Sequence, residues 1–74
     1  MVTKEDVLQA LDGIDIAIPI GDIRVGIPLA HQGLDSLDLA ALMLALESKY
    51  NRTISPEKFA RLRTINDIVT FLNI

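Results

Sequence analysis

Residues 33–46 read Gly-Leu-Asp-Ser-Leu-Asp-Leu-Ala-Ala-Leu-Met-Leu-Ala-Leu, and here an irregular segment ends and the most helical run of the chain begins. A Ser between two Asp residues, directly before a run of Leu and Ala, is typical of a helix start. Either Asp35 or Ser36 could cap the first free backbone N–H groups. Asp35 and Asp38 also suit the positive end of the helix dipole. The pattern predicts a helix over about residues 35–50, with Ser36 at its start.

This helix is expected to carry two apolar stripes. One has the spacing of a core-facing side and consists of Leu39, Leu42, Met43, Leu46 and Tyr50. The other lies on the opposite side, where a surface helix normally carries charged groups, and consists of Leu37, Ala41, Leu44 and Ser48. Either the protein has more apolar residues than it can bury, or the second stripe belongs to a docking surface beside Ser36. That surface would comprise Asp35, Leu37, Asp38, Ala41, Leu44 and Glu47.

Two segments precede this helix. Thr3-Lys4-Glu5-Asp6 resembles a capping box with Asp in place of Glu, and Gly13 supplies a stop, so a first helix is expected over residues 4–12. Over residues 14–29, branched apolar residues alternate with smaller or polar ones around Gly21-Asp22, which is typical of a β-hairpin. Against a hairpin, Pro19 and Pro28 remove ladder donors, and an isolated hairpin is marginal in water. The residues alone do not decide whether this segment forms a hairpin or a loop.

The remainder of the chain predicts two shorter helices. Asn51-Arg52-Thr53 breaks the central helix, and Ser55-Pro56 is typical of an N-cap followed by proline at the first helical position. This short helix is expected to turn Phe59 and Leu62 inward, and its outward residues would be Lys58, Arg61 and Arg63. Thr64-Ile65-Asn66-Asp67 is another box-like start. The inward stripe of the last helix would be Ile65, Ile68, Val69 and Leu72.

Length and composition limit the classes of protein to consider. The 74 residues suffice for one domain with a single small core. The formal net charge is −3, but five of the seven basic residues lie between positions 49 and 63. The absence of Cys excludes disulfides and cysteine-based zinc sites or nucleophiles. No apolar run approaches the roughly 20 residues of a membrane span, and no signal-peptide pattern is present, so a cytoplasmic protein without a membrane partner is expected.

Catalytic and nucleic-acid-binding functions find little support. His31 is the only His, and a triad with Ser36 and Asp35 would lack an oriented base and an oxyanion hole. A metal site from His31, Asp35 and Asp38 is no better, because nothing fixes a closed ligand set. The basic cluster could favour nucleic acid, but net acidity and only three aromatic residues argue against it. A helical protein-interaction module without a prosthetic group remains an alternative function.

The order of residues around Ser36 resembles the acyl carrier protein family. The matching residues are Leu29, Gly33, Leu34-Asp35-Ser36-Leu37-Asp38, Leu42, Leu46-Glu47, Tyr50, Ile54-Ser55-Pro56-Glu57 and Thr64-Ile65-Asn66-Asp67-Ile68. The resemblance runs over essentially the whole chain. It implies an all-α fold, a small four-helix bundle of three longer helices and one short helix, with a long loop after the first helix. For residues 14–29 it therefore favours a loop over a hairpin.

The resemblance also implies a function. A phosphopantetheinyl transferase would attach 4′-phosphopantetheine to Ser36 through a phosphodiester, with Asp35 helping to position the metal ion used in that reaction. The arm would hold an acyl or aminoacyl group as a thioester and present it to acyl-loading and acyl-processing enzymes. Residues 1–74 would form one acyl carrier domain, expected to be a monomer with no catalytic residue and no metal site of its own.

Several positions depart from the family pattern. Fatty-acid-type carriers usually have a strongly acidic second helix, whereas this chain has Ala41, Ser48 and Lys49 where acids are common, and Gln32 where Leu often precedes the Gly. We therefore expect a carrier of a specialised pathway, such as polyketide, modified-lipid or aminoacyl-thioester synthesis, instead of general fatty acid biosynthesis. Two small residues, Ala40 and Ala45, are hypothetical places where the bundle could open for an acyl chain. The alternative is an interaction module without a prosthetic group.

Overall fold

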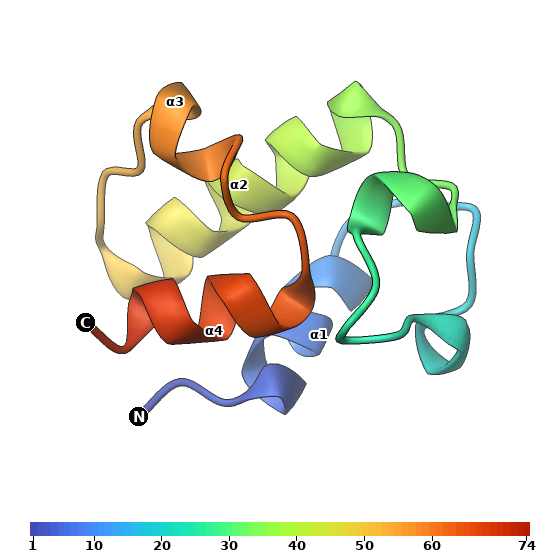
Figure 1. Cartoon of the computed structure of the whole chain (residues 1–74), viewed down its shortest axis with the longest axis horizontal. Coiled ribbons are helices and arrows are strands. Elements are labelled where there is room, and N and C mark those ends of the chain that lie inside the picture. The colour runs from blue at the N-terminus through green and yellow to red at the C-terminus, as the bar shows by residue number, and fades with distance from the viewer.

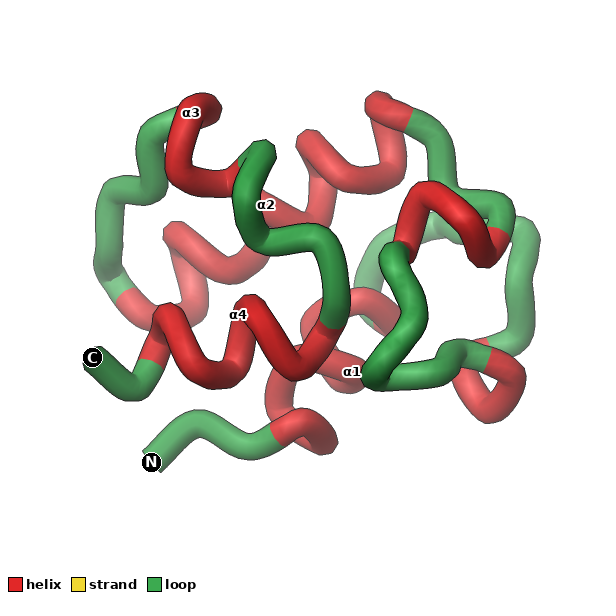
Figure 2. The backbone as a smooth tube through the Cα atoms, in the orientation of Figure 1, coloured by secondary structure: helices red, strands yellow, loops and turns green.

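Four α-helices and no strand make up the computed structural model, which describes all residues from 1 to 74 (Figures 1 and 2). The helices are α1 (Lys4–Asp12), α2 (Ser36–Tyr50), α3 (Pro56–Phe59) and α4 (Ile65–Leu72). The expected all-α bundle of three longer helices and one short helix is confirmed. The first helix has the bounds predicted from its capping signals.

The three longer helices begin with the same local chemistry. In each, the side chain of the N-cap residue accepts a hydrogen bond from the backbone N–H three residues later, and an Asp at that later position accepts one from the N-cap N–H. The pairs are Thr3 with Asp6, Asp35 with Asp38, and Thr64 with Asp67. The backbone hydrogen bond from Thr3 lowers the pKa of Asp6. Each box satisfies two free backbone donors, so these starts are encoded by neighbours in sequence.

The segment between α1 and α2 is a loop, and the alternative β-hairpin is wrong. Two short 3₁₀ turns, η1 (Ile20–Asp22) and η2 (Leu29–Gln32), each follow a proline with an extended backbone. The Gln32 amide holds the loop together: its Oε1 accepts from Arg24 N at 2.7 Å, and its Nε2 donates to the carbonyl oxygens of Arg24 and Ile27 at 2.8 Å. Backbone groups that a hairpin would have paired are thus satisfied by a side chain.

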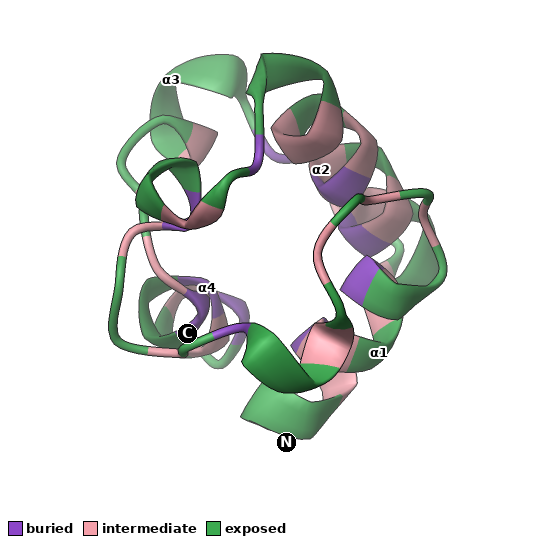
Figure 3. Ribbon diagram, turned by 90° about the vertical axis from the view of Figure 1, so that its right-hand side faces the viewer, coloured by how far each residue is buried: buried purple, intermediate pink, exposed green.

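The branched side chains of this loop contribute to the core. The buried residues are Val7, Leu11, Ile23, Leu29, Leu34, Leu42, Leu46, Ile54, Ile65, Ile68 and Leu72. Within α2, Leu42 and Leu46 are completely buried, while Leu39, Met43 and Tyr50 are half-buried against the core. Helix α1 packs against both α2 and α4, and the buried parts of these helices face inward (Figure 3). The predicted core face of α2 is therefore correct.

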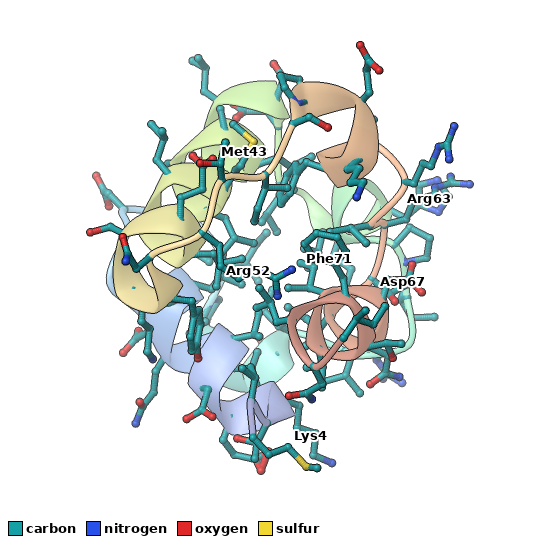
Figure 4. All side chains as sticks on the ribbon, turned by 90° about the vertical axis from the view of Figure 1, so that its left-hand side faces the viewer. Lys4, Met43, Arg52, Arg63, Asp67 and Phe71 are labelled. Atoms are coloured by element: carbon teal, nitrogen blue, oxygen red, sulfur yellow. The ribbon has the colours of Figure 1, made fainter.

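The C-terminal end of α4 is held by Arg52, a residue of the basic cluster and of the segment predicted to end the central helix. The Arg52 guanidinium donates to the carbonyl oxygens of Phe71 at 3.5 Å and Leu72 at 3.2 Å, and it lies 4.8 Å from the centre of the Phe71 ring (Figure 4). A cation at this end of a helix satisfies free carbonyls and suits the helix dipole. Arg52 is thus a structural cation, which distinguishes it from its basic neighbours in sequence.

Candidate functional site

Ser36 is the first residue of α2 and is exposed to solvent. The cap of α2 is made by the side chain of Asp35, which accepts from the N–H of Asp38 at 2.9 Å. Of the two capping residues that the sequence left open, Asp35 is therefore the one in use. The Ser36 hydroxyl takes part in none of the side-chain hydrogen bonds of the structure. It is a free hydroxyl at the first position of the helix.

Two residues before α2 set the position of Ser36. Gly33 ends η2 with φ +95°, in the left-handed region, and Leu34 is buried in the core. A Cβ atom on Gly33 would lie 2.8 Å from Cδ1 of Ile18. Only glycine combines this backbone conformation with such a close neighbour at little cost. The chain can therefore turn sharply from the loop into the helix that carries Ser36.

Replacing Gly33 with Ala is expected to destabilise the protein by about 1–2 kcal/mol, because a left-handed conformation is unfavourable for a residue with a Cβ. The Ile18 side chain would also have to move. Gly21→Ala is the matched control, since nothing lies within 4 Å of its Cβ position and its φ is not left-handed; it should be neutral or stabilise by roughly 0.4–1 kcal/mol. Urea unfolding of both variants measures the difference. Equal stabilities would show that Gly33 is not required at this turn.

A mostly apolar groove of about 350 Å³ lies beside Ser36, between α2 and the α3 region. Its lining residues are Pro28, Ala30, Ser36, Leu39, Ala40, Met43, Pro56, Phe59, Ala60, Leu62 and Arg63. Ser36 and Arg63 are the two polar residues among them. Sequence periodicity assigned Phe59 and Leu62 to the core, and in the structure they are half-buried walls of this groove. Of the two small residues considered as openings of the bundle, Ala40 lines the groove and Ala45 does not.

The proposed docking residues differ in how far their side chains are exposed to solvent. Leu37 and Leu44 are 78% and 61% exposed, and Asp35 is exposed as well. Ala41 and Asp38 are half-buried, and one Asp38 oxygen accepts the hydrogen bond from Asp35 N. Two large apolar side chains thus remain in contact with solvent on one helix, and their role in docking stays a prediction.

Glu47 is half-buried and has a structural partner. Its Oε2 accepts from the backbone N–H of Ile54 at 2.7 Å, which holds the segment after α2 against the helix. Periodicity could not reveal this contact, because it joins a helix to the irregular segment that follows it. A docking role for Glu47 would therefore have to use its other carboxylate oxygen.

The structure gives no support to a catalytic triad or a metal site around Ser36. His31 is exposed in η2, and no hydrogen bond joins it to Ser36. No three His, Cys, Asp or Glu side chains come together in a way that could hold a metal ion. None of the helices is both long enough and apolar enough to cross a membrane.

Comparison with known proteins decides the family. The family model described as the phosphopantetheine attachment site matches residues 6–72, which is nearly the whole chain. The chain belongs to the phosphopantetheine-attachment family. Domains of this family bear 4′-phosphopantetheine covalently and are carriers, not enzymes, and this confirms the family resemblance seen in the sequence.

Three curated relatives are each named acyl carrier protein. The chain is 45% identical to the acyl carrier protein of Chlamydia caviae over 38 residues, which are 51% of this chain and 49% of the relative. It is 42% identical to that of Chlamydia felis over 38 residues, with the same coverage. It is 40% identical to that of Syntrophus aciditrophicus over 42 residues, which are 57% of this chain and 52% of the relative. The matches span about half the length of these relatives. No solved structure is significantly similar to the chain.

Proposed function

We propose that residues 1–74 act as an acyl carrier protein, in which Ser36 bears 4′-phosphopantetheine and the arm carries an acyl or aminoacyl group as a thioester. The observation that carries this proposal is the free, exposed Ser36 hydroxyl at the start of a capped helix, on the edge of an apolar groove. The family match over residues 6–72 supports it. In the attachment reaction the Ser36 oxygen would bond to the phosphorus of the pantetheine phosphate of coenzyme A, with release of adenosine 3′,5′-bisphosphate and a proton.

The first test is the mass of the intact protein. The purified chain is incubated with coenzyme A, Mg²⁺ and a broad-specificity phosphopantetheinyl transferase, and the mass should increase by one phosphopantetheine. Fragmentation of the product should place the added group on Ser36. An unchanged mass of the folded protein, with a working control carrier, would instead favour an interaction module without a prosthetic group.

The carrier would contribute by tethering its cargo. An arm fixed at one point raises the effective concentration of the bound group at each enzyme that docks beside it. The apolar groove next to Ser36 suits the temporary shelter of an acyl chain, because Leu39, Met43 and Phe59 offer apolar surface at its wall. A thioester sheltered there would be removed from water between encounters with enzymes.

The two methionines allow a test of this shelter. Met43 lines the groove, whereas Met1 is fully exposed. With ¹³C-labelled methionine methyl groups, loading an octanoyl group on the arm should shift the Met43 signal relative to the unacylated protein and leave the Met1 signal unchanged. An acetyl group, which is too short to fill the groove, is the matched control. Identical Met43 signals with acetyl and octanoyl groups would contradict the proposed position of the chain.

Leu44 provides a test of the proposed docking surface of Asp35, Leu37, Asp38, Ala41, Leu44 and Glu47. Because Leu44 is 61% exposed, Leu44→Asp should leave the melting temperature nearly unchanged. Loss of an apolar anchor at an interface should raise the KM of the transferase for the carrier roughly tenfold. Thr70→Asp, at an exposed position of α4, is the control and should leave KM unchanged. A large fall in melting temperature would show that Leu44 stabilises the core.

The proposal also concerns the kind of pathway in which this carrier acts. The non-acidic residues Ala41, Ser48 and Lys49 on α2 support a dedicated pathway, such as polyketide or modified-lipid synthesis, over general fatty-acid synthesis. Efficient elongation of the acylated protein by general fatty-acid enzymes would contradict this assignment. Action as a cytoplasmic monomer, without nucleic-acid or membrane partners, stays a prediction from composition.

A further inference from the structure

Charge is strongly separated along this chain. Residues 1–48 contain eight acidic and two basic side chains, whereas residues 49–63 contain five basic side chains and one acidic side chain, Glu57. The difference corresponds to local net charges of −6 and +4 within a protein of net charge −3. Three of the five cations, Lys58, Arg61 and Arg63, are exposed on α3 and the segment that follows it. They are called the α3 basic surface below.

The other two cations of this segment have structural partners. Lys49 Nζ donates to the carbonyl oxygen of Asp6 at 3.3 Å, and Arg52 binds the C-terminal end of α4. In contrast, the guanidinium groups of Arg61 and Arg63 take part in none of the side-chain hydrogen bonds of the structure, and Lys58 lies only near the Phe71 ring, at 5.7 Å. Stabilising the fold therefore accounts for Lys49 and Arg52 but leaves the two exposed arginines without a role.

The backbone at Arg63 is held by two hydrogen bonds. The carbonyl oxygen of Arg63 accepts from Leu29 N at 2.8 Å, and the N–H of Arg63 donates to Asp67 Oδ2 at 3.1 Å. The first bond ties the segment to η2, and the second ties it to the start of α4. Figure 4 shows the Arg63 side chain extending outward, away from Met43. A cation held at a fixed place on the surface loses less entropy on binding than one on a mobile tail.

One residue of the α3 basic surface, Arg63, lies next to the site of attachment. Arg63 and Ser36 line the same groove, so a protein that covers the mouth of this groove to reach Ser36 also approaches Arg63. Asp35, whose side chain caps α2, directly precedes Ser36 in the chain, and Asp38 lies two residues after it. Ser36 therefore has carboxylates near it in the chain at the start of α2, and the Arg63 side chain lines the same groove as Ser36.

We propose that Lys58, Arg61 and Arg63 form a second docking surface, for a protein partner that presents a cluster of Asp and Glu carboxylates. Guanidinium groups bind carboxylates through paired hydrogen bonds, which favours arginine at such contacts. Carboxylates at the start of α2 and cations on the α3 basic surface would together orient the partner, because only one orientation places each charge against its complement. This surface is separate from the apolar face of α2, and its binding does not require the arm.

The test uses a short oligoglutamate peptide as the probe and the ¹⁵N-labelled, unmodified protein at low salt. The largest amide shifts are expected at residues 58–63 and should disappear as salt is added. Arg61→Gln and Arg63→Gln should each weaken binding roughly threefold, and together about tenfold. Lys4→Gln removes the same charge at an exposed position far from Arg63 (Figure 4) and should change the affinity by less than a factor of about two.

Four outcomes would overturn the proposal: no shift on adding the peptide, shifts of equal size around Lys4, tighter binding of a single-stranded oligonucleotide than of the peptide, or self-association of the protein at the same concentration in sedimentation experiments. Because Arg61 and Arg63 are exposed, the melting temperatures of their variants should match that of the parent. The same titration of the Ser36→Ala protein should give the same affinity. Failure of phosphopantetheine attachment and failure of the α3 basic surface are thus distinguishable.

Discussion

Ser36→Ala is expected to abolish the mass increase produced by coenzyme A and a phosphopantetheinyl transferase. The substitution removes the only oxygen that the side chain offers for a phosphodiester, so the loss should be complete. Ser36 is exposed and its hydroxyl makes no hydrogen bond to the protein. Because the Asp35–Asp38 capping box remains, the melting temperature should be unchanged or slightly higher, as Ala is the better helix former. Intact mass spectrometry and thermal unfolding measure the two effects.

Ser48→Ala is the matched control for this experiment. Ser48 lies on the same helix and is also exposed, so the substitution makes the same chemical change away from the groove. The Ser48→Ala protein should gain one phosphopantetheine at the rate of the parent. Modification of the Ser36→Ala protein, or loss of modification in the Ser48→Ala protein, would show that Ser36 is not the attachment residue.

Leu42→Ala is expected to cost about 2–5 kcal/mol of the free energy of unfolding, as is usual for truncation of a completely buried leucine. Leu42 is 0% exposed and belongs to the middle of α2, where the core is built. A core in a domain below about 70–80 residues rarely supplies more than 3–5 kcal/mol. The variant should therefore be largely unfolded at 37 °C, and it should be a poor transferase substrate because Ser36 loses its fixed position.

Leu44→Ala is the matched control for Leu42→Ala. It tests whether the loss of stability comes from the burial of the side chain and not from the Leu-to-Ala change itself. The residue type, the helix and the change are the same, but Leu44 is 61% exposed. Its free energy of unfolding should change by less than about 0.5 kcal/mol. Urea titrations followed by far-ultraviolet circular dichroism measure both variants. Similar losses in the two proteins would contradict the division of α2 into a core face and an exposed face.

Local sequence was sufficient to predict where the helices begin. The capping boxes of Thr3 and Thr64 involve partners three residues away, and the proline after Ser55 is pre-set for a first helical turn. The core face of α2 also follows from sequence, because helical periodicity determines which residues share a side. The position of Ser36 at the start of α2 is thus a property of its neighbours in the chain. The family resemblance, carried by the same residues, supplied the expected chemistry.

Short-range patterns could not decide features that join distant segments. Residues 14–29 alternate like strands, but their side chains pack against helices, and Gln32 satisfies the backbone of Arg24 and Ile27. The groove beside Ser36 exists because α2 and the α3 region come together across the bundle. The contact of Arg52 with the last carbonyls of α4 spans about 20 residues in sequence. Periodicity reports which residues share a face, whereas the partner of that face, and the space left between them, depend on three-dimensional packing.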